Sequence, residues 1–528
     1  MKKILCLIFA LLLSFTVISC GGKNKDSESE STPSSQSTPA EVQVDANYLR
    51  YDLQTPFDTT LDGIGAQMDT DIFMPWNNMT KEDEALWEQR IADMNLQFTR
   101  IKFFPEFNER ANDNADPNTF DYNGAGVDFN SVEMQALYKI LDICEKYGIN
   151  VDLSWYGCYV WFESYDGKYT NGTWMGYTRE DIGPDAWVSA PKKTNTFDGY
   201  AEYAENISVT LKYLTEVKKY TCIYGFSVIA EMFMLDDGSG NAIISYDAYA
   251  DCCKIVDERL KKDGIRDKFK FIGTSNQGHN LNYFVDEQQK TKDYFDIMGT
   301  GNYNWEYNDP IESAENYFAD VLDIVHDFGK KGWYVAEFCQ GKHFLDAVNK
   351  TDIDDYTAGM YISRFILAAL NQGVTAFNHY ILGDTYFTNS YVHTMGLWQY
   401  RDKGWKAHPE YYFFGLITKY SDIGSVVYPV ERNPKKSRTD DIIISALKLP
   451  DGGWTYYVSN KSGQAKKIAI VNQNAGAPTK LNAYKITESA IPEDRACVLP
   501  SKYTEVNCYQ SVAYVTVPAC GFVVLSTR

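Results

Sequence analysis

Short apolar runs alternate with longer amphipathic segments between residues 60 and about 380. The runs are rich in β-branched and aromatic residues, which is typical of buried strands. Between them, apolar residues recur every three or four positions, as at Val132, Ala136 and Ile140, until Gly148 ends the stripe. This pattern predicts eight strands, each followed by a helix, at residues 64–66, 98–103, 150–154, 223–230, 269–273, 295–299, 333–336 and 374–377.

Eight strands separated by helices over about 350 residues predict an α/β fold, a parallel (β/α)8 TIM barrel. An open doubly wound sheet is the alternative, but the count reaches eight and no GxGxxG motif follows the first strand. After about residue 440 the helical stripes give way to β-rich runs joined by turns, such as residues 442–447 and 512–517. We therefore expect a barrel at residues 47–425 and an antiparallel β-sandwich at residues 426–528.

The first 46 residues have a different character. Two lysines precede an apolar run at residues 4–18, which indicates a signal peptide at residues 1–19. Residues 17–20, Val-Ile-Ser-Cys, resemble a bacterial lipobox, in which Cys20 would be lipidated; an ordinary signal peptide is the alternative. Residues 20–46 are mostly polar and predict a flexible tether. We expect an outer-membrane lipoprotein, facing the periplasm or the cell surface, that contacts the membrane only through this anchor.

Composition narrows the class of partner. The 528 residues include 50 Lys and Arg against 71 Asp and Glu, and the net charge of −21 argues against nucleic acid as a partner. Aromatic residues make up 15% of the chain, more than a core needs, and exposed aromatic rings suit sugars. The 11 Cys form no CxxC motif and the 6 His no HExxH motif, so we expect neither a metal site nor another cofactor.

Two glutamates occupy matching places. Glu231 follows the apolar residues 226–230, in the expected strand four, and Glu337 follows residues 333–336, in strand seven. In a (β/α)8 barrel, chemistry gathers at the carboxyl ends of the strands. Burial disfavours an ionised carboxylate and a nearby cation favours it, so such a pair can supply one acid and one charged group for glycosidic cleavage. For either glutamate alone, a structural ion pair or cap is the alternative.

These residues resemble the superfamily of retaining (β/α)8 glycoside hydrolases that includes cellulases and β-mannanases, over about residues 60–420. The resemblance implies that Glu231 is the acid/base and Glu337 the nucleophile. It also implies that Arg100, at the end of strand two, orients the nucleophile and that Tyr303, after strand six, donates a hydrogen bond to it. One departure is Ala230, because many members have Asn there to contact the sugar 2-hydroxyl.

Aromatic side chains cluster in the segment 155–195 and in the segment after strand eight. Most should pack among themselves, but rings on loops beside acidic groups also suit pyranose stacking. Besides Arg100 and Tyr303, the predicted substrate-binding residues are Trp155, Trp161, His379 and Trp398, of which Trp161 and Trp398 should face solvent. Asp69 and Asp71, after strand one, could bind sugar hydroxyls, but we expect them to cap a turn. The acidic run 236–241 lacks the ligand spacing of a calcium loop.

The sequence therefore predicts a monomeric O-glycosyl hydrolase that cleaves a β-linked oligo- or polysaccharide by double displacement, of the endo-acting β-glucanase or β-mannanase type. A hypothesis from another class is a non-catalytic glycan-binding lipoprotein on the same fold, which Ala230 favours and the two glutamates oppose. Release of reducing ends from a panel of polysaccharides distinguishes the two.

Overall fold

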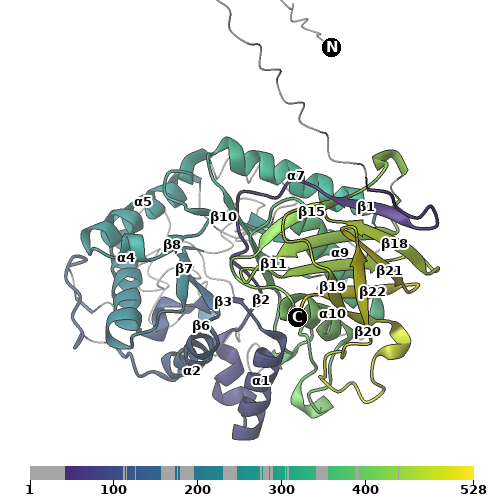
Figure 1. Cartoon of the computed structure of the whole chain (residues 1–528). Helices are drawn as coiled ribbons and strands as arrows, with labels where there is room; N and C mark the ends of the chain where they lie inside the picture. The colour runs from purple at the N-terminus through teal and green to yellow at the C-terminus, as the bar shows by residue number, and fades with distance from the viewer. Residues whose placement is uncertain are drawn as a thin grey trace, which may run out of the picture. The chain divides into compact units, whose positions relative to one another are not determined.

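The computed structural model describes residues 42–110, 113–114, 116–124, 126–155, 173–174, 177–178, 196–229, 246–273, 276–277, 285, 289–303, 305, 309–339, 355–386, 392–437 and 439–528. Residues 44–528 form one compact unit, which is the body described below (Figure 1). The predicted signal peptide, Cys20 and most of the tether lie outside the described residues. Within those residues, no helix combines the length and the apolar character needed to cross a bilayer.

Eight strand positions form a parallel barrel in the first part of the body. Along the chain they are β2 (Gly63–Ala66), β3 (Phe98–Phe103), β4 (Asn150–Trp155), β7 (Ile223–Ser227), β8 (Lys270–Phe271), β10 (Ile297–Asn302), β11 (Gly332–Phe338) and β12 (Ala376–His379). Neighbours in this order pair in parallel, and β12 pairs with β2. Between β8 and β10 the ring is completed by a parallel bridge from Ile272 to Ile297, and the short β9 (Asn276–Gln277) extends the edge of β10. The predicted (β/α)8 barrel is confirmed.

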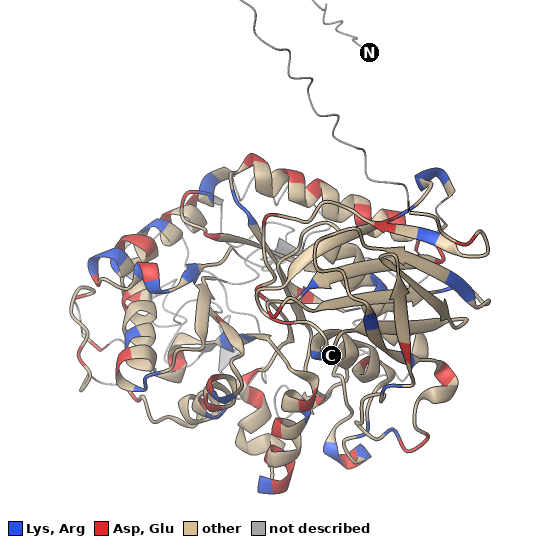
Figure 2. Ribbon diagram, viewed as in Figure 1, with Lys and Arg blue, Asp and Glu red and all other residues tan. Residues whose placement is uncertain are grey.

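Helices follow the strands and surround the barrel. They are α1 (Lys81–Met94), α2 (Val132–Tyr147), α4 (Thr196–Lys212), α5 (Tyr246–Lys262), α7 (Ile311–Asp327), α9 (Tyr356–Leu370) and α10 (Pro409–Lys419). Local signals set their ends: Thr80 and Asp83 form a capping box on α1, and Gly148 ends α2 with a φ of 67°. Figure 2 shows charged residues mainly on these helices and the outer loops. Two short hairpins, β5 (Thr173–Trp174) with β6 (Tyr177–Thr178) and β13 (Thr385–Tyr386) with β14 (Val392–His393), lie in connecting segments.

The barrel interior is apolar at its floor and polar above it. The floor is a separate apolar cluster in which the rings of Phe98 and Tyr334 lie 5.0 Å apart. Side chains alternate along a strand, so the next inward position on β3 after Phe98 is Arg100. The change from apolar to charged side chains therefore marks the end of the barrel that holds the candidate site.

The C-terminal β domain has nine strands, one of them from the N-terminal side of the barrel. They are β1 (Leu49–Leu53), β15 (Val426–Arg432), β16 (Ile442–Lys448), β17 (Trp454–Asn460), β18 (Lys466–Val471), β19 (Lys480–Ile486), β20 (Thr504–Tyr509), β21 (Val512–Val517) and β22 (Gly521–Ser526). They pair in a closed order, β1-β15-β16-β17-β22-β19-β20-β21-β18, and all neighbours are antiparallel except β1 and β18. The predicted β-rich second domain is confirmed.

The expected barrel range of 47–425 needs one correction, because β1 belongs to the β domain. Tyr51 is 3% exposed and lies in the apolar core of that domain, with Leu49 and Leu53 packed against it. β1 pairs with β15 on one side and β18 on the other. The sequence of a five-residue strand does not identify the strands with which it pairs. The position of β1 next to the barrel in the sequence was therefore misleading.

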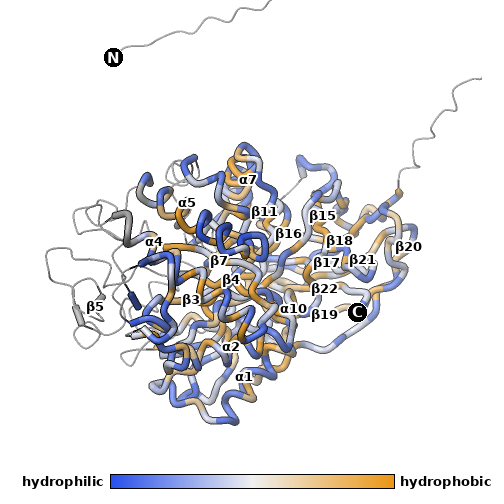
Figure 3. Tube along the Cα trace, turned by 90° about the vertical axis from the view of Figure 1, so that its left-hand side faces the viewer, coloured by the Kyte–Doolittle hydropathy of each residue, from blue (hydrophilic) through white to orange (hydrophobic). Residues whose placement is uncertain are grey.

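The barrel and the β domain share one hydrophobic core. The outer faces of β16, β17 and β22 contribute Ile443, Tyr457 and Phe522 to the cluster that contains α9 and α10. Tyr457 also donates a hydrogen bond of 3.0 Å to the carbonyl oxygen of Ile417 in α10. Hydrophobic stretches of α10, β17 and β22 lie together in Figure 3. The β domain thus covers helices that would otherwise expose apolar surface.

Candidate active site

Glu337 faces the barrel interior because of a β-bulge in β11. The pairing of β11 with β10 steps from Val335 directly to Glu337, so Ala336 has no partner in that ladder. Phe338 points outward, where it stacks on Phe365 of α9 with ring centroids 4.7 Å apart. Strict alternation would place Glu337 on the same outer side as Val335. The bulge reverses the alternation and turns the carboxylate inward.

Arg100 on β3 is the cation that contacts Glu337. One guanidinium nitrogen, Nη1, forms an ion pair with Oε1 of Glu337, and Nε donates a 3.0 Å hydrogen bond to the hydroxyl of Ser154 on β4. The backbone amide of Arg100 donates to Oδ1 of Asn378 on β12 at 3.1 Å. Arg100 is 1% exposed, and Glu337 is 7% exposed. Ser154 on β4 and Glu337 on β11 therefore hold the guanidinium, and Asn378 on β12 holds the backbone of Arg100, away from bulk water.

Tyr303, just after β10, holds the second oxygen of the same carboxylate. Its hydroxyl donates a 2.7 Å hydrogen bond to Oε2 of Glu337. Burial and the negative charge of Glu337 raise the pKa of Tyr303 well above its ordinary value, so the phenol remains a donor. Both oxygens of Glu337 thus accept a hydrogen bond, which stabilises the charged carboxylate and fixes its plane. The structure brings together Arg100, Tyr303 and Glu337, as the sequence predicts.

The second glutamate, Glu231, lies outside the described residues, as does Trp161. The strand that leads to Glu231, β7, ends at Ser227. The hydroxyl oxygen of Ser227 lies 2.7 Å from that of Ser154, which accepts the hydrogen bond from Arg100. The end of β7 is therefore connected to Arg100 through two hydrogen bonds.

The turn that follows β7 has an unusual backbone. Ile229 has a φ of 47°, in the left-handed region that β-branched residues rarely adopt. Its amide donates to the hydroxyl of Tyr203 on α4 at 3.2 Å, and the hydroxyl of Tyr249 on α5 lies 3.4 Å from the carbonyl oxygen of Val228. Two helices therefore hold a strained turn in place, and such strain concentrates at functional sites.

Asp152 lies beneath Ser154 on β4 and was not predicted. Ser154 donates a 3.0 Å hydrogen bond to Oδ2 of Asp152, whereas Oδ1 has no hydrogen-bond partner among the described residues. Burial raises the pKa of Asp152 to about 6, and the positive charge of Arg100 opposes this shift. Alternation along β4 places Asp152 and Ser154 on one face, so the sequence did carry a signal for this pair.

A second polar group lies beside Arg100, around Lys102. The ammonium of Lys102 lies 3.9 Å from Oδ2 of Asp69 and 3.4 Å from the hydroxyl of Tyr380. That hydroxyl lies 3.2 Å from Nδ1 of His393. Burial, with the charge of Lys102, lowers the pKa of His393 to about 3, so the imidazole is neutral at neutral pH.

Asp69 was expected to cap a turn, but its side chain accepts hydrogen bonds from Gln67 and from the backbone amide of Lys102, at 2.7 and 3.1 Å. The short helix that follows Asp69 has no side-chain cap. This group could not be predicted from the sequence, because β3 and β12 bring together residues that are distant along the chain. A small pocket opens beside it, lined by Gln67, Asp69, Asp71, Ile72, Ile381, Gly383, Thr385 and His393.

Three residues predicted to contact substrate have packing roles instead. Trp155, His379 and Trp398 are fully buried. The indole N–H of Trp155 donates to Oδ1 of Asn206 at 3.2 Å, and Trp398 packs edge-on against Trp87 with ring centroids 5.0 Å apart. His379 packs against two phenylalanine rings. No ring face is left for a sugar, so these predictions are corrected. In a sequence, an aromatic residue near a strand end looks the same whether it packs inward or faces a cleft.

Comparison with known proteins gives a clear result for the fold. No protein-family model matches the sequence, and no curated protein matches it. Solved structures do match: a family GH30 endoxylanase from Clostridium papyrosolvens aligns with a TM-score of 0.61 and 13% identity, over 91% of this chain and 99% of that one. The chain has the fold of the (β/α)8 glycoside hydrolases.

Two further glycoside hydrolases have the same fold. An endo-β1,6-glucanase aligns with a TM-score of 0.60 and 14% identity, over 90% of this chain and 93% of that one. A monomeric β-xylosidase from Caulobacter crescentus aligns with a TM-score of 0.59 and 12% identity, over 91% and 99%. The predicted superfamily resemblance is confirmed at the level of the fold, and the chemistry must be argued from the residues of this chain.

Proposed function

We propose that this protein is a retaining glycoside hydrolase that cleaves a β-linked glycan. The observation that carries the proposal is Glu337, a buried carboxylate at the end of a barrel strand whose two oxygens are held by Arg100 and Tyr303. A carboxylate that is charged, oriented and shielded from water is prepared to attack an electrophilic carbon. The fold shared with known glycoside hydrolases makes the anomeric carbon of a sugar the natural target.

In the proposed mechanism, Glu337 attacks the anomeric carbon while Glu231, as an acid, protonates the departing glycosidic oxygen. A covalent glycosyl-enzyme forms and the leaving sugar departs. Glu231, now a carboxylate, removes a proton from water, which attacks the anomeric carbon and releases Glu337. Arg100 and Tyr303 hold Glu337 in both steps. The connection from Ser227 through Ser154 to Arg100 supports a position for Glu231 on the same side of the barrel.

The proposed substrate is an oligo- or polysaccharide outside the cytoplasm, cleaved internally as by an endo-acting β-glucanase or β-mannanase. Two of the enzymes with the same fold are an endoxylanase and an endo-β1,6-glucanase, which favours internal cleavage.

The proposal also includes lipidation at Cys20 as the membrane anchor. Replacing Cys20 with Ala should move the protein out of the membrane fraction; an unchanged distribution would refute the anchor.

The test is product analysis on a panel of β-glucans, β-mannans and xylans with the wild type and two variants. Glu337→Gly should lose turnover by at least about 10⁴-fold, and azide should restore cleavage of an activated β-glycoside with inverted anomeric configuration. Glu231→Ala should keep the first step on such a substrate, and azide should give a product of retained configuration. Glu133→Gln is the control: it changes a buried carboxylate on α2, and its turnover should equal that of the wild type.

Two outcomes would contradict the proposal. Wild-type turnover in the Glu337 variant would place the chemistry elsewhere. If the wild type cleaves no glycan but is retarded by several in an affinity gel, the protein is the glycan-binding alternative.

A further inference from the structure

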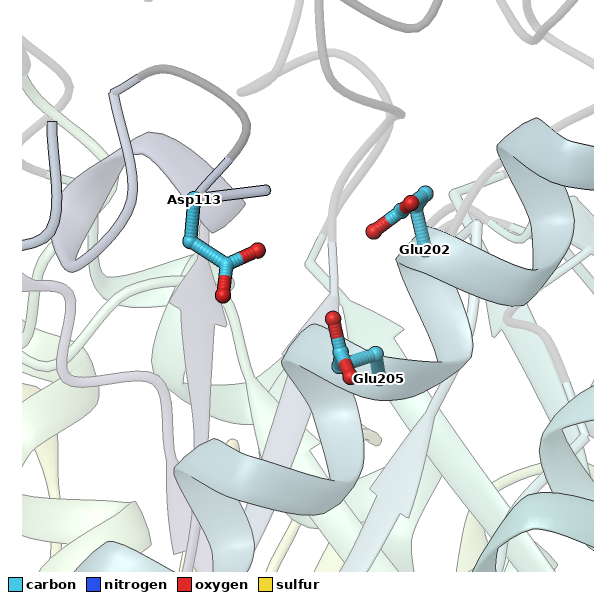
Figure 4. Close-up of side chains that lie close together, drawn as sticks. All are labelled: Asp113, Glu202 and Glu205. Carbon is cyan, nitrogen blue, oxygen red and sulfur yellow. The ribbon is translucent and has the colours of Figure 1, made fainter. Parts of the chain in front are cut away.

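Three carboxylates from two separated segments of the chain meet beside the barrel. Asp113 comes from the irregular segment after β3, and Glu202 and Glu205 come from α4. One oxygen of each lies within 4.8 Å of the others. Figure 4 shows the three side chains directed toward a common space. All are buried, with exposed fractions of 8%, 6% and 1% in that order.

Asp113 and Glu205 each have one oxygen that the described surroundings leave unsatisfied. Arg259 on α5 contacts Glu205 at 3.3 Å through Nη2, but its Nε is bound to Asp263 at 2.6 Å. Two oxygens, Oδ1 of Asp113 and Oε2 of Glu205, have no hydrogen-bond partner among the described residues, although both are shielded from water. A buried carboxylate oxygen without a donor or cation is costly. The position of these two oxygens in the cluster indicates that a ligand occupies the space between the carboxylates.

We propose that Asp113, Glu202 and Glu205 bind a calcium ion. The available ligands are all carboxylate oxygens, which hard cations prefer, and the cluster contains no His or Cys among the described residues. Calcium binds oxygens at about 2.3–2.6 Å, so two ligands on opposite sides are about 5 Å apart, and the cluster fits within that span. Calcium also tolerates ligands from an irregular segment, whereas magnesium demands near-octahedral geometry and retains its waters.

The ion would join the segment after β3 to α4. This segment already makes polar contacts with the helices: Asn206 of α4 donates to Oε2 of Glu109 at 3.1 Å, and Arg259 donates to the carbonyl oxygen of Pro117 at 2.6 Å. Asn206 also accepts the hydrogen bond from Trp155 at the end of β4. A calcium ion held by Glu205, the residue before Asn206, would therefore stabilise this wall of the barrel. The sequence alone predicted no metal site, because Asp113 lies about ninety residues before Glu202 and Glu205 in the chain.

A proton is the competing explanation for the cluster. Burial raises the pKa of Glu205 to about 7, with Asp113 adding to the effect and Arg259 opposing it. Glu205 and a neighbouring carboxylate would then share a proton at low pH. A proton and a calcium ion in the same space exclude each other, so stabilisation of the protein by calcium distinguishes the two explanations.

The experiment is calorimetric titration of calcium chloride into the full-length protein after treatment with EDTA. We expect one site with a Kd of about 10⁻⁶–10⁻³ M and a higher melting temperature with calcium. Glu205→Gln should weaken binding at least about tenfold. Glu133→Gln, at a buried carboxylate paired with Arg110 at 2.8 Å, should bind calcium as the wild type does.

Several results would overturn the site. One is the absence of binding heat and of any shift in melting temperature at about 10 mM calcium, a concentration above the dissociation constants of the weakest extracellular calcium sites. Another is equal affinity in the wild type and in Glu205→Gln, or in Asp113→Asn if the first variant does not fold. Magnesium binding as tight as calcium would refute the choice of ion. If calcium has no effect while Glu205→Gln is more stable than the wild type at pH 8, a shared proton replaces the metal.

Discussion

Arg100 and Tyr303 contribute differently to the state of Glu337. Arg100 supplies a full positive charge, and its removal would take away a cation that compensates a buried carboxylate. Tyr303 supplies a single directed hydrogen bond, so it can be tested with less risk to the fold.

We predict that Tyr303→Phe lowers kcat/KM by about 10- to 100-fold, because a hydrogen bond to a charged group contributes about 1.5–3 kcal/mol. Tyr334→Phe is the matched control, since Tyr334 lies in the same barrel and its hydroxyl has no hydrogen-bond partner in the described part of the chain. Steady-state kinetics on one cleaved glycan measures both. Equal losses in the two variants would mean that Tyr303 acts through packing alone.

Asp152 gives a prediction about pH and stability. Its pKa in the folded protein, about 6, lies above the ordinary 3.8, so the folded state binds the proton more tightly. The associated stability is complete below about pH 4 and is lost as the pH rises through 6. Asp152→Asn should remove this loss, worth about 2–3 kcal/mol between pH 4 and pH 7.

Urea unfolding at several pH values measures the slope of the free energy of unfolding against pH. Asp494→Asn, at an exposed carboxylate, should retain the wild-type slope. A wild-type slope in Asp152→Asn would assign the titration to another group.

The sequence predicted individual residues unevenly, for physical reasons. Glu337, Arg100 and Tyr303 could be predicted because strand ends and the superfamily resemblance identify them. The group around Lys102 and Asp69 could not, since it depends on contacts between strands far apart in the sequence. Trp398 was misassigned because burial is a property of the folded neighbourhood.

At the scale of elements, strand and helix periodicity was a reliable guide, and local irregularity was not. All eight barrel strands were predicted, because their buried positions repeat along the chain. The bulge at Ala336, which directs Glu337 inward, was not predicted, because one extra residue in a ladder leaves no trace in an apolar run. β1 was missed for a similar reason, since its partners follow it by 381 and 419 residues, from Tyr51 to Arg432 and from Leu49 to Ile468.

The crossing of α9 and α10 yields a prediction at this scale. A Cβ atom on Gly359 would lie 2.3 Å from the ring of Phe413, which is too close for any real contact. Gly359→Ala should therefore destabilise the protein by about 1–3 kcal/mol through overpacking, despite the better helix propensity of alanine.

Gly463→Ala is the control, because a Cβ there has open space and Gly463 lies outside the helices. Thermal and urea unfolding compare the two variants. A Gly359→Ala variant as stable as the wild type would mean that the two helices can separate at little cost.

At the scale of the whole molecule, β1 closes the ring of the β domain. We predict that a protein starting at residue 55 melts at a lower temperature and aggregates more readily than one starting at residue 44. Removing β1 leaves β15 and β18 with unpaired edges and exposes the core around Tyr51. Calorimetry and light scattering measure the difference. Equal melting temperatures would show that the β domain is complete without its N-terminal strand.

The place of β1 also sets an order for synthesis. A chain emerging from the ribosome presents this strand before the rest of the body, yet its two partners arrive only with residues 426–432 and 466–471. Until then β1 is an unpaired strand whose Leu49, Tyr51 and Leu53 have no core to join. Closing so long a loop is slow, so the final step of folding should be the capture of the first strand. Binding factors that shield unpaired extended segments would act on this protein mainly at β1.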